Sequence, residues 1–224
     1  MRLASLHSGG KDSSLALYIA EQMGHVVEYI VNIVPSSEDS MIFHVPNSDM
    51  VPLIAEASGK RLIRSITKGS EEDDMKALRE ALIGLDIEGV VIGAVLSDYQ
   101  WDRVNRVCGD LDLICLAPLW RKSQEDVMAE LIDSGISAII AGVYADGLDD
   151  SWLGRNICGS YDDLKKIKGI SIIGEGGEYE SLTLDSPLQT HVLEPIEIEK
   201  IWNGHSGTMH VKSARLVKKQ FRRD

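Results

Sequence analysis

Cysteine, aromatic residues and long apolar runs are all scarce in this sequence of 224 residues. Its three cysteines, Cys108, Cys115 and Cys158, form no CxxC pair, and an odd number is typical of a reducing compartment rather than of a disulfide scaffold. No uncharged stretch is long enough to cross a bilayer, and no long apolar run precedes a cleavage site near the N-terminus. These absences predict a cytoplasmic globular protein without a membrane partner.

Positive charge is also in deficit. Lys and Arg number 23 against 35 Asp and Glu, which gives a formal net charge of -12. Because an acidic surface repels the phosphates of DNA and RNA, no nucleic-acid partner is expected. The short basic tail at 218–223 is expected to be a solvated chain end.

The first half of the chain alternates between strand-like and helix-like patterns. The predicted strands are 3–7, 26–34, 61–66, 89–95 and 113–116, and the predicted helices are 12–23, 47–57, 70–83 and 97–108. Strands that alternate with helices in this order form a parallel sheet with helices on both faces. The sequence therefore predicts an α/β fold.

The pattern changes beyond Trp120. A helix is expected at 123–134 and a strand at 138–143, and after a glycine-rich stretch the end of the chain, 190–217, is rich in strand-forming residues. We therefore expect two parts, an α/β domain at 1–121 and a smaller C-terminal α+β lobe at 122–224. No Pro/Ser-rich linker separates them, so they are expected to pack as one unit.

The sequence SGGKDS at 8–13 directly follows the first predicted strand and opens the first predicted helix. In this position backbone N–H groups and the helix dipole can face an anion, and Gly9 and Gly10 allow a phosphate to approach the backbone closely. The alternative is a tight strand-to-helix turn without a ligand. The spacing is neither that of the GxxxxGK[ST] loop nor GxGxxG.

The side chains of the same segment suit a nucleotide. Lys11 supplies a cationic donor, and Ser8 and Ser13 supply hydroxyl donors. Asp12 can cap the helix or help to hold a magnesium ion. Together with the two glycines, these residues are the candidate ATP-binding set.

A second candidate segment follows the apolar strand expected at 89–95. Ser97 can cap the next helix, and helical spacing puts Tyr99 and Arg103 near one face. Arg103 could clamp a carboxylate or phosphate with two hydrogen bonds. The alternative is a surface arginine paired with Asp98 or Asp102.

A third segment, GEGGEYES at 174–181, holds three carboxylates around two glycines. Glu175, Glu178 and Glu180, beside Gly176 and Gly177, could bind a cationic group, orient ammonia or hold magnesium. The alternative is a solvated hairpin turn.

The segment at 8–13 resembles the SGGxDS signature of the PP-loop ATP pyrophosphatases. This resemblance implies a Rossmann-like (HUP-type) parallel-sheet domain, ATP and Mg²⁺ as cofactors, and cleavage of ATP to AMP and pyrophosphate. The sequence leaves no room for a separate glutaminase domain, and residue 2 is Arg rather than a nucleophilic Cys, so free ammonia is the expected nitrogen source for an amide-forming member.

Three motifs in order resemble the diphthine–ammonia ligase family: SGGKDS, then GAVLSDYQWDRVNRV leading into PLW at 118–120, then GEGGEYES followed by DSP at 185–187. Two shorter stretches, FHVPN at 43–47 and LGR at 153–155, also resemble the family. Asn105 stands where the family usually has Glu, and Ser181 stands where Thr is usual, which keeps a hydroxyl. The resemblance covers nearly the whole chain and fits the short archaeal type.

The resemblance implies a ligase that converts diphthine, a modified histidine of translation elongation factor 2, to diphthamide with ammonia. The carboxylate of diphthine would be activated as an acyl-adenylate. The elongation factor would be the protein partner, and the sequence is compatible with a homo-oligomer.

The family likeness also implies roles for the candidate residues. The catalytic set is Lys11, Asp12, Glu175 and Glu178, and Asp12 is the metal ligand. A carboxylate of the third segment would attract the trimethylammonium group of diphthine and deprotonate ammonium. The substrate-binding set is Ser97, Tyr99, Gln100, Arg103, Gly176, Gly177, Glu178 and Glu180.

Other functions stay open at this point. A PP-loop ligase or thiolase could act on another small carboxylate or on tRNA, although the cysteines lack the paired spacing that thiolases often have. A sensor could hold ATP or AMP without turnover. The sensor needs the phosphate loop but has no use for the clustered carboxylates.

Overall fold

The structure of the protein, a computed structural model, describes residues 1–35 and 47–219. Of the FHVPN stretch, positions 43–46 lie outside the described residues, as do the last five residues of the chain. Within the described ranges, no helix is both long enough and apolar enough to span a membrane.

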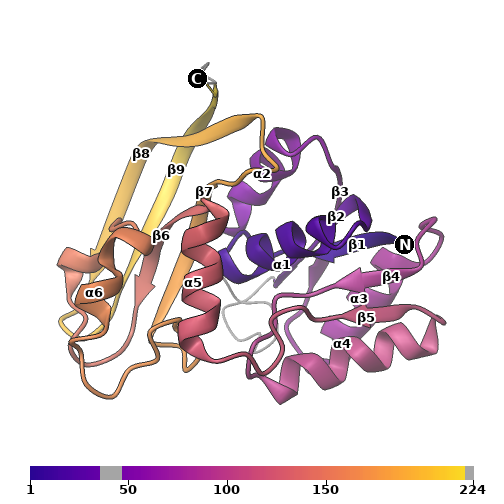
Figure 1. Ribbon diagram of the computed structural model, residues 1–224, viewed down its shortest axis with the longest axis horizontal. Coiled ribbons are helices and arrows are strands. Elements are labelled where there is room, and N and C mark those ends of the chain that lie inside the picture. The colour runs from indigo at the N-terminus through magenta and orange to yellow at the C-terminus, as the bar shows by residue number, and fades with distance from the viewer. Residues whose placement is uncertain (36–46, 220–224) are drawn as a thin grey trace.

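The first five strands form one parallel sheet, in the order β3-β2-β1-β4-β5 (Figure 1). The strands are β1 (Arg2–Leu6), β2 (Val26–Pro35), β3 (Arg61–Thr67), β4 (Gly89–Val91) and β5 (Ile114–Leu116). The parallel α/β fold expected from the sequence is confirmed.

Helices cover both faces of this sheet. The helices are α1 (Lys11–Gln22), α2 (Val51–Ala57), α3 (Glu71–Leu82) and α4 (Asp98–Asp110). Neighbouring residues of β1 point to opposite faces: Leu3 packs with α1 and α2, whereas Ala4 packs with α3 and α4. The sheet therefore has a separate apolar layer on each face, one shared with α1 and α2 and the other with α3 and α4.

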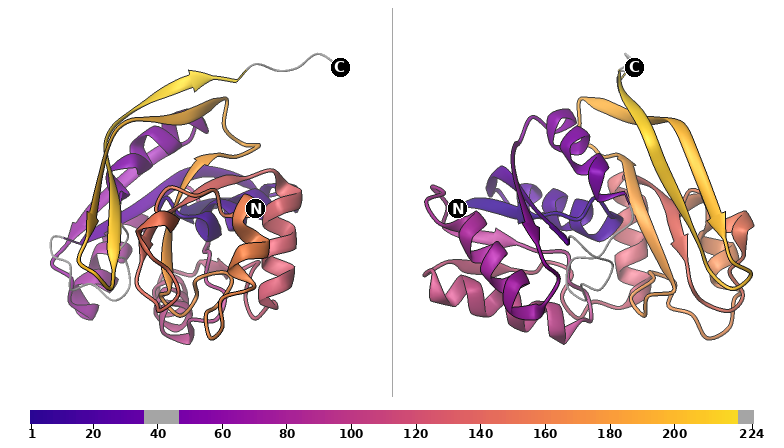
Figure 2. Two further views of the ribbon diagram at one scale, coloured as in Figure 1. Left: turned by 90° about the vertical axis from the view of Figure 1, so that its left-hand side faces the viewer. Right: turned by 180° about the vertical axis from the view of Figure 1, so that it is seen from behind.

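The second half of the chain forms a four-stranded antiparallel sheet in the order β7-β6-β9-β8. Its strands are β6 (Ser137–Val143), β7 (Tyr179–Asp185), β8 (His191–Trp202) and β9 (Gly207–Lys218). The short helical pieces are η1 (Ser48–Met50), η2 (Asp150–Trp152), η3 (Cys158–Ser160) and α6 (Tyr161–Leu164). The expected smaller α+β lobe is thus present, and Figure 2 shows its β8–β9 hairpin extending beyond the rest of the molecule.

The two sheets share one apolar core. Helix α5 (Gln124–Ser134) packs against α1, and Leu15 of α1 belongs to the same buried cluster as Leu131 and Leu182 of the second half. The division into 1–121 and 122–224 stays a prediction. The shared core places β7 beside the beginning of α1, which matters for the site.

Two elements differ from the sequence prediction. The strand expected at 89–95 ends at Val91, because the chain leaves the sheet before Gly93, which approaches the backbone of α1. The helix expected at 47–57 begins as the 3-10 turn η1 and continues as α2, with Pro52 in the first turn, where its missing N–H costs nothing.

The predicted caps and the cysteines follow simple physical rules. Ser97 caps α4 by accepting a hydrogen bond from the Gln100 N–H. Cys108 is buried and hydrogen-bonds to the half-buried Cys115, and Cys158 is also half-buried. All three cysteines are free thiols that pack as small side chains.

Candidate functional site

The phosphate-loop candidate lies at the carboxyl end of β1, between β1 and α1. In this sheet the strand order reverses between β1 and β4, and ligands of open α/β sheets bind in the crevice at such a switch point. Gly9 has a φ of 93°, in the left-handed region that favours glycine, so the sharp turn out of β1 needs this residue.

The loop is tied together by its own serines. The Ser13 hydroxyl donates to the Gly10 carbonyl at 3.0 Å, and the Ser8 and Ser13 hydroxyl oxygens are 3.3 Å apart. The Gly10 N–H donates to the Ser8 hydroxyl at 3.3 Å. These contacts hold the turn compact at the positive end of α1, where the first helical N–H groups lack intrahelical partners.

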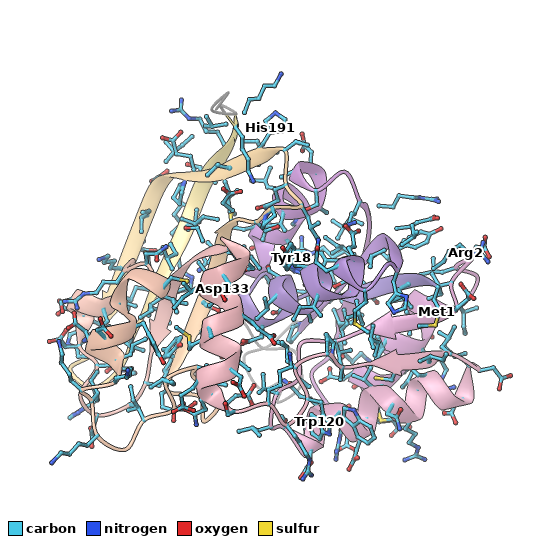
Figure 3. The ribbon with its side chains drawn as sticks, viewed as in Figure 1. Met1, Arg2, Tyr18, Trp120, Asp133 and His191 are labelled. Carbon is cyan, nitrogen blue, oxygen red and sulfur yellow. The ribbon has the colours of Figure 1, made fainter. Side chains whose placement is uncertain are left out.

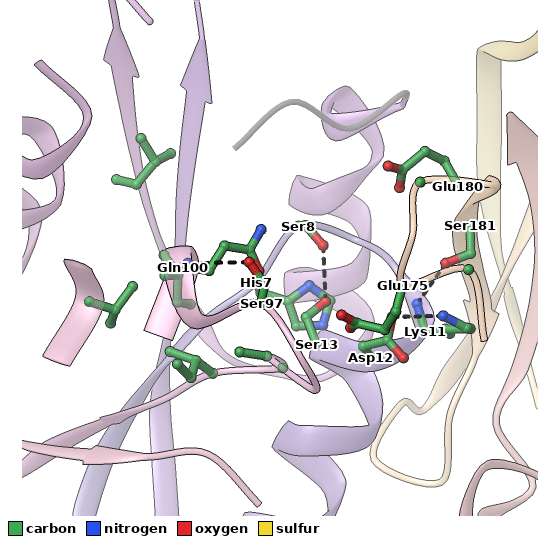
Figure 4. Close-up of a pocket in the computed structure, with 18 of the residues that line it drawn as sticks. His7, Ser8, Lys11, Asp12, Ser13, Ser97, Gln100, Glu175, Glu180 and Ser181 are labelled. Atoms are coloured by element: carbon green, nitrogen blue, oxygen red, sulfur yellow. Dashed lines mark hydrogen bonds and ion pairs between the residues drawn. The ribbon is translucent and has the colours of Figure 1, made fainter. Parts of the chain in front are cut away.

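A cavity of about 370 Å³ opens above this loop (Figure 4). It is lined by Leu6, His7, Ser8, Lys11, Asp12, Ser13, Asn32, Ile33, Ile92, Gly93, Ala94, Ser97, Gln100, Val104, Gly174, Glu175, Gly177, Tyr179, Glu180 and Ser181. All three segments singled out in the sequence therefore reach one cavity, and the structure brings the two halves of the chain together around it.

Lys11 is the cation of this cavity, although only 3% of its side chain is exposed. Its ammonium nitrogen donates to Asp12 Oδ2 at 2.7 Å and lies 5.4 Å from the centre of the Tyr179 ring. Burial alone lowers the pKa of Lys11, but Asp12, Tyr179 and Glu175 raise it overall, so the ammonium stays charged. Asp12 Oδ1 is buried and has no hydrogen-bond partner within the described part of the chain.

Two carboxylates from the second half enter the same cavity. Glu175 accepts a hydrogen bond from the Leu96 N–H at 3.2 Å, and burial followed by the charge of Asp12 raises its pKa. Burial raises the pKa of Glu180 to about 7. Glu180 therefore changes its charge near neutral pH in this structure.

Some expected residues lie outside the cavity. Tyr99 and Arg103 turn to α3: the Arg103 guanidinium lies 3.3 Å from the centre of the Tyr99 ring, and both side chains donate to Glu71, at 2.9 Å from Tyr99 and 2.8 Å from Arg103. The Arg103 hydrogen bond lowers the pKa of Glu71. Beyond them, Trp101 stacks on Trp120, which Figure 3 places at the lower edge of the view.

Glu178 does not line this cavity; with Gly176 it lines the adjoining, more open one. Its two carboxylate oxygens accept the N–H groups of Ser171 and Gly176, each at 2.8 Å, so it closes the 171–178 loop upon itself. Gly9, Gly10 and Gly176 shape the backbone beside the cavity without lining it. A second, more open cavity adjoins the first and shares Ser97 and Glu175 with it.

Several lining residues were not expected from the sequence. His7, Asn32 and Tyr179 are buried, and burial lowers the pKa of His7 to about 4, so its imidazole is neutral. Gly93 has no room for a side chain, because an ideal Cβ would lie 2.6 Å from the Ser13 nitrogen. Ser181 accepts a hydrogen bond from the Lys11 N–H at 3.1 Å, and its place at the end of the GEGGEYES motif was the available signal.

Comparison with known proteins adds the family. The chain matches the family described as Diphthamide synthase N-terminal domain over residues 1–114 and the one described as Diphthamide synthase C-terminal domain over residues 123–217. A solved structure, described as a predicted subunit of tRNA methyltransferase from Methanocaldococcus jannaschii, has a TM-score of 0.47 at 13% identity over 84% of this chain and 98% of that one. That likeness carries no conclusion about function.

Curated relatives agree with the two domain matches. The diphthine–ammonia ligases of Danio rerio and Rattus norvegicus are 37% and 39% identical to this chain over 213 and 215 residues. The alignments cover 84% of this chain in both cases, and 84% and 80% of the relatives. The human diphthine–ammonia ligase is 37% identical over 214 residues, with 84% and 80% coverage. This chain therefore belongs to the diphthamide synthase family.

Proposed function

We propose that this protein is an ATP-dependent diphthine–ammonia ligase. In the first step, the carboxylate of diphthine attacks the α-phosphorus of ATP and pyrophosphate leaves, which gives an acyl-adenylate. In the second, ammonia attacks the acyl carbon, and the amide and AMP are released with one proton. The observation that carries this proposal is a single cavity that joins the SGGKDS loop to two carboxylates of the other lobe.

The phosphates would lie over the beginning of α1. There the hydroxyl of Ser8 and the ammonium of Lys11 can donate to phosphate oxygens, and the helix N-terminus favours the negative charge. The Ser13 hydroxyl can do so only after it leaves the Gly10 carbonyl. Charge that builds on the departing pyrophosphate would then be stabilised by donors that are already in place.

The nucleoside would lie toward β2. Asn32 donates its amide to the His7 carbonyl at 3.0 Å, which fixes the orientation of the amide, and its Oδ1 is buried without a partner in the described ranges. An acceptor in this position suits a hydroxyl or amino donor of ATP. Leu6, Ile33 and Ile92 supply apolar surface beside it.

Asp12 fits a magnesium ion. Its Oδ1 is a buried oxygen without a hydrogen-bond partner among the described residues, and magnesium sites near phosphates typically use one or two carboxylates together with phosphate oxygens and water. No cluster of three or more acidic, histidine or cysteine ligands occurs in the parts of the chain that the structure covers, which agrees with a site completed by the nucleotide. When bound, the ion would neutralise phosphate charge.

Glu175 and Glu180 would act on the acceptor side. Their carboxylates can attract the trimethylammonium group of diphthine, and Glu180, which titrates near neutral pH, can take a proton from ammonium. Glu178 we assign to holding the 171–178 loop, because both of its oxygens already accept backbone N–H groups. Elongation factor 2 is the proposed protein substrate.

The test is pyrophosphate release from ATP with magnesium and ammonium, with and without diphthine-bearing elongation factor 2. We expect release that depends on the factor, and a mass change on the factor that corresponds to replacement of a carboxylate by an amide. ATP binding without release under any of these conditions would contradict a ligase and favour a nucleotide sensor.

A further inference from the structure

Four hydrogen bonds form a closed circuit that begins and ends at Gly9. The Gly9 N–H donates to His7 Nδ1 at 3.0 Å, and His7 Nε2 lies 3.2 Å from the Ser14 hydroxyl. That hydroxyl donates to Thr183 Oγ1 at 2.9 Å, and the Thr183 N–H donates to the Gly9 carbonyl at 2.8 Å. The circuit thus passes from the first lobe into β7 and back.

The protons of His7 and Ser14 in the circuit each have one consistent place. Because Nδ1 of His7 accepts from the Gly9 N–H, the neutral ring must carry its proton on Nε2 and donate to Ser14. Ser14 then has its own proton free for Thr183. Burial keeps His7 neutral, since it is only 2% exposed and its pKa is lowered.

The circuit fixes both polar groups of the residue that turns the loop. Gly9 has a φ of 93°, and its N–H and carbonyl are both held by residues outside the hexapeptide. A further bond, from the Lys11 N–H to Ser181, also comes from β7. The N–H groups that this leaves for phosphates are those later in the first turn of α1.

We propose that His7, Ser14 and Thr183 are positioning residues, which act through Gly9 to hold the loop in its pyrophosphate-binding form. This inference rests on the proposed function of the loop. A loop that is held before binding loses little conformational freedom when the anion arrives, whereas a loose loop must be ordered at the expense of affinity. Thr183 of the second lobe, which does not line the cavity, would thus support the phosphate site from behind Gly9.

The experiment measures binding of inorganic pyrophosphate and of adenosine to the full chain by calorimetry, for wild type, Ser14→Ala, Thr183→Val and the double variant. Thr183→Val, which removes the bond from Ser14, and Ser14→Ala, which removes that bond and the one from His7, are each expected to bind pyrophosphate about five- to tenfold more weakly, the effect of one or two lost hydrogen bonds. Because both substitutions open the same circuit, the double variant should be no weaker than the weaker single variant. Adenosine binding should not change.

Two controls separate positioning from folding. Thr183→Ser keeps the hydroxyl that Thr183→Val removes, so it should bind pyrophosphate as wild type does. Ser134→Ala removes a buried hydroxyl that donates to the Leu131 carbonyl in α5, away from the loop, and should bind pyrophosphate as wild type does. Melting temperatures show whether each variant is folded.

The outcomes are distinct. Wild-type pyrophosphate affinity in folded Ser14→Ala and Thr183→Val would overturn the inference and leave the proposed function standing. Additive losses in the double variant would also overturn it, because the bonds would then act independently. A wild-type protein that binds neither ATP nor pyrophosphate would overturn the proposed function, and the inference with it.

Discussion

Replacing Gly93 by alanine tests whether the segment that follows β4 sets the position of the phosphate loop. An ideal Cβ at Gly93 would lie 2.6 Å from the Asp12 carbonyl carbon and 2.6 Å from the Ser13 nitrogen. Non-bonded atoms of these kinds pack at about 3.5–4.0 Å, so one of the two segments must move by about 1 Å. Both clashing partners are backbone atoms, which no side-chain rotation can relieve.

The expected effect has two parts. Overpacking of this kind costs about 1–3 kcal/mol of unfolding free energy. Displacing the first turn of α1 by about 1 Å is expected to slow pyrophosphate release by about a hundredfold, because reacting groups must keep their geometry closely. Urea unfolding gives the first quantity, and a pyrophosphate-release assay with saturating substrates gives the second.

Gly109→Ala is the matched control. Gly109 lies in α4, and within residues 1–35 and 47–219 no atom beyond its chain neighbours and the adjacent helix backbone lies within 4 Å of the Cβ that would be added there. Alanine at this position should leave pyrophosphate release unchanged and raise the unfolding free energy by about 0.5–1 kcal/mol. Wild-type release in Gly93→Ala, or equal behaviour of the two variants, would refute the idea that Gly93 is needed for the loop.

Four further changes have defined outcomes. Lys11→Met should reduce pyrophosphate release by about 10- to 100-fold, since it removes a charged donor. The rate of amide formation by the wild type should rise with pH through about 7, as Glu180 ionises. In Glu180→Gln the rate should not rise over this pH range. Burial lowers the pKa of His7 from 6.5 to about 4, so between these two pH values the imidazole is protonated in the unfolded chain but not in the folded one. The free energy of unfolding should therefore fall by about 3 kcal/mol as the pH drops from 6.5 to 4. His7→Gln should remove this pH dependence, measured by urea unfolding at each pH. Asn32→Leu should weaken ATP binding but not pyrophosphate binding. Binding of 2′-deoxy-ATP, 3′-deoxy-ATP and inosine triphosphate to the wild type should show which hydroxyl or amino group of ATP donates to Asn32. If the variant weakened pyrophosphate binding as much as ATP binding, the contact of Asn32 with the nucleoside would be contradicted.

Local features of the site were predictable from sequence because they depend on neighbours in the chain. The SGGKDS loop follows from a strand, two glycines and a helix start in succession, and Ser97 caps α4 as its position indicates. Helical spacing also placed Tyr99 beside Arg103 correctly. Spacing does not say which element faces that pair, and Glu71 of α3, far away in sequence, takes both donors.

Features that depend on packing between the two halves were not predictable. Thr183 reaches Gly9 because α1 and β7 share a core, and no periodicity in the sequence encodes that contact. Glu178 looked like its neighbours Glu175 and Glu180 in sequence, yet its carboxylate turns back to the loop backbone. Which of the three carboxylates line the cavity therefore depends on the backbone path of the 174–180 segment, which the sequence pattern does not indicate.

The bond from Thr183 to Gly9 has a consequence for the order in which the chain is made. A ribosome synthesises Gly9 early and Thr183 late, so a nascent chain that ends before β7 has no partner in that strand for the Gly9 carbonyl or for the Lys11 N–H. The nucleotide site is therefore finished only when most of the protein has emerged. If Thr183 has the positioning role proposed above, translation products that end before β7 would bind pyrophosphate more weakly than the full chain.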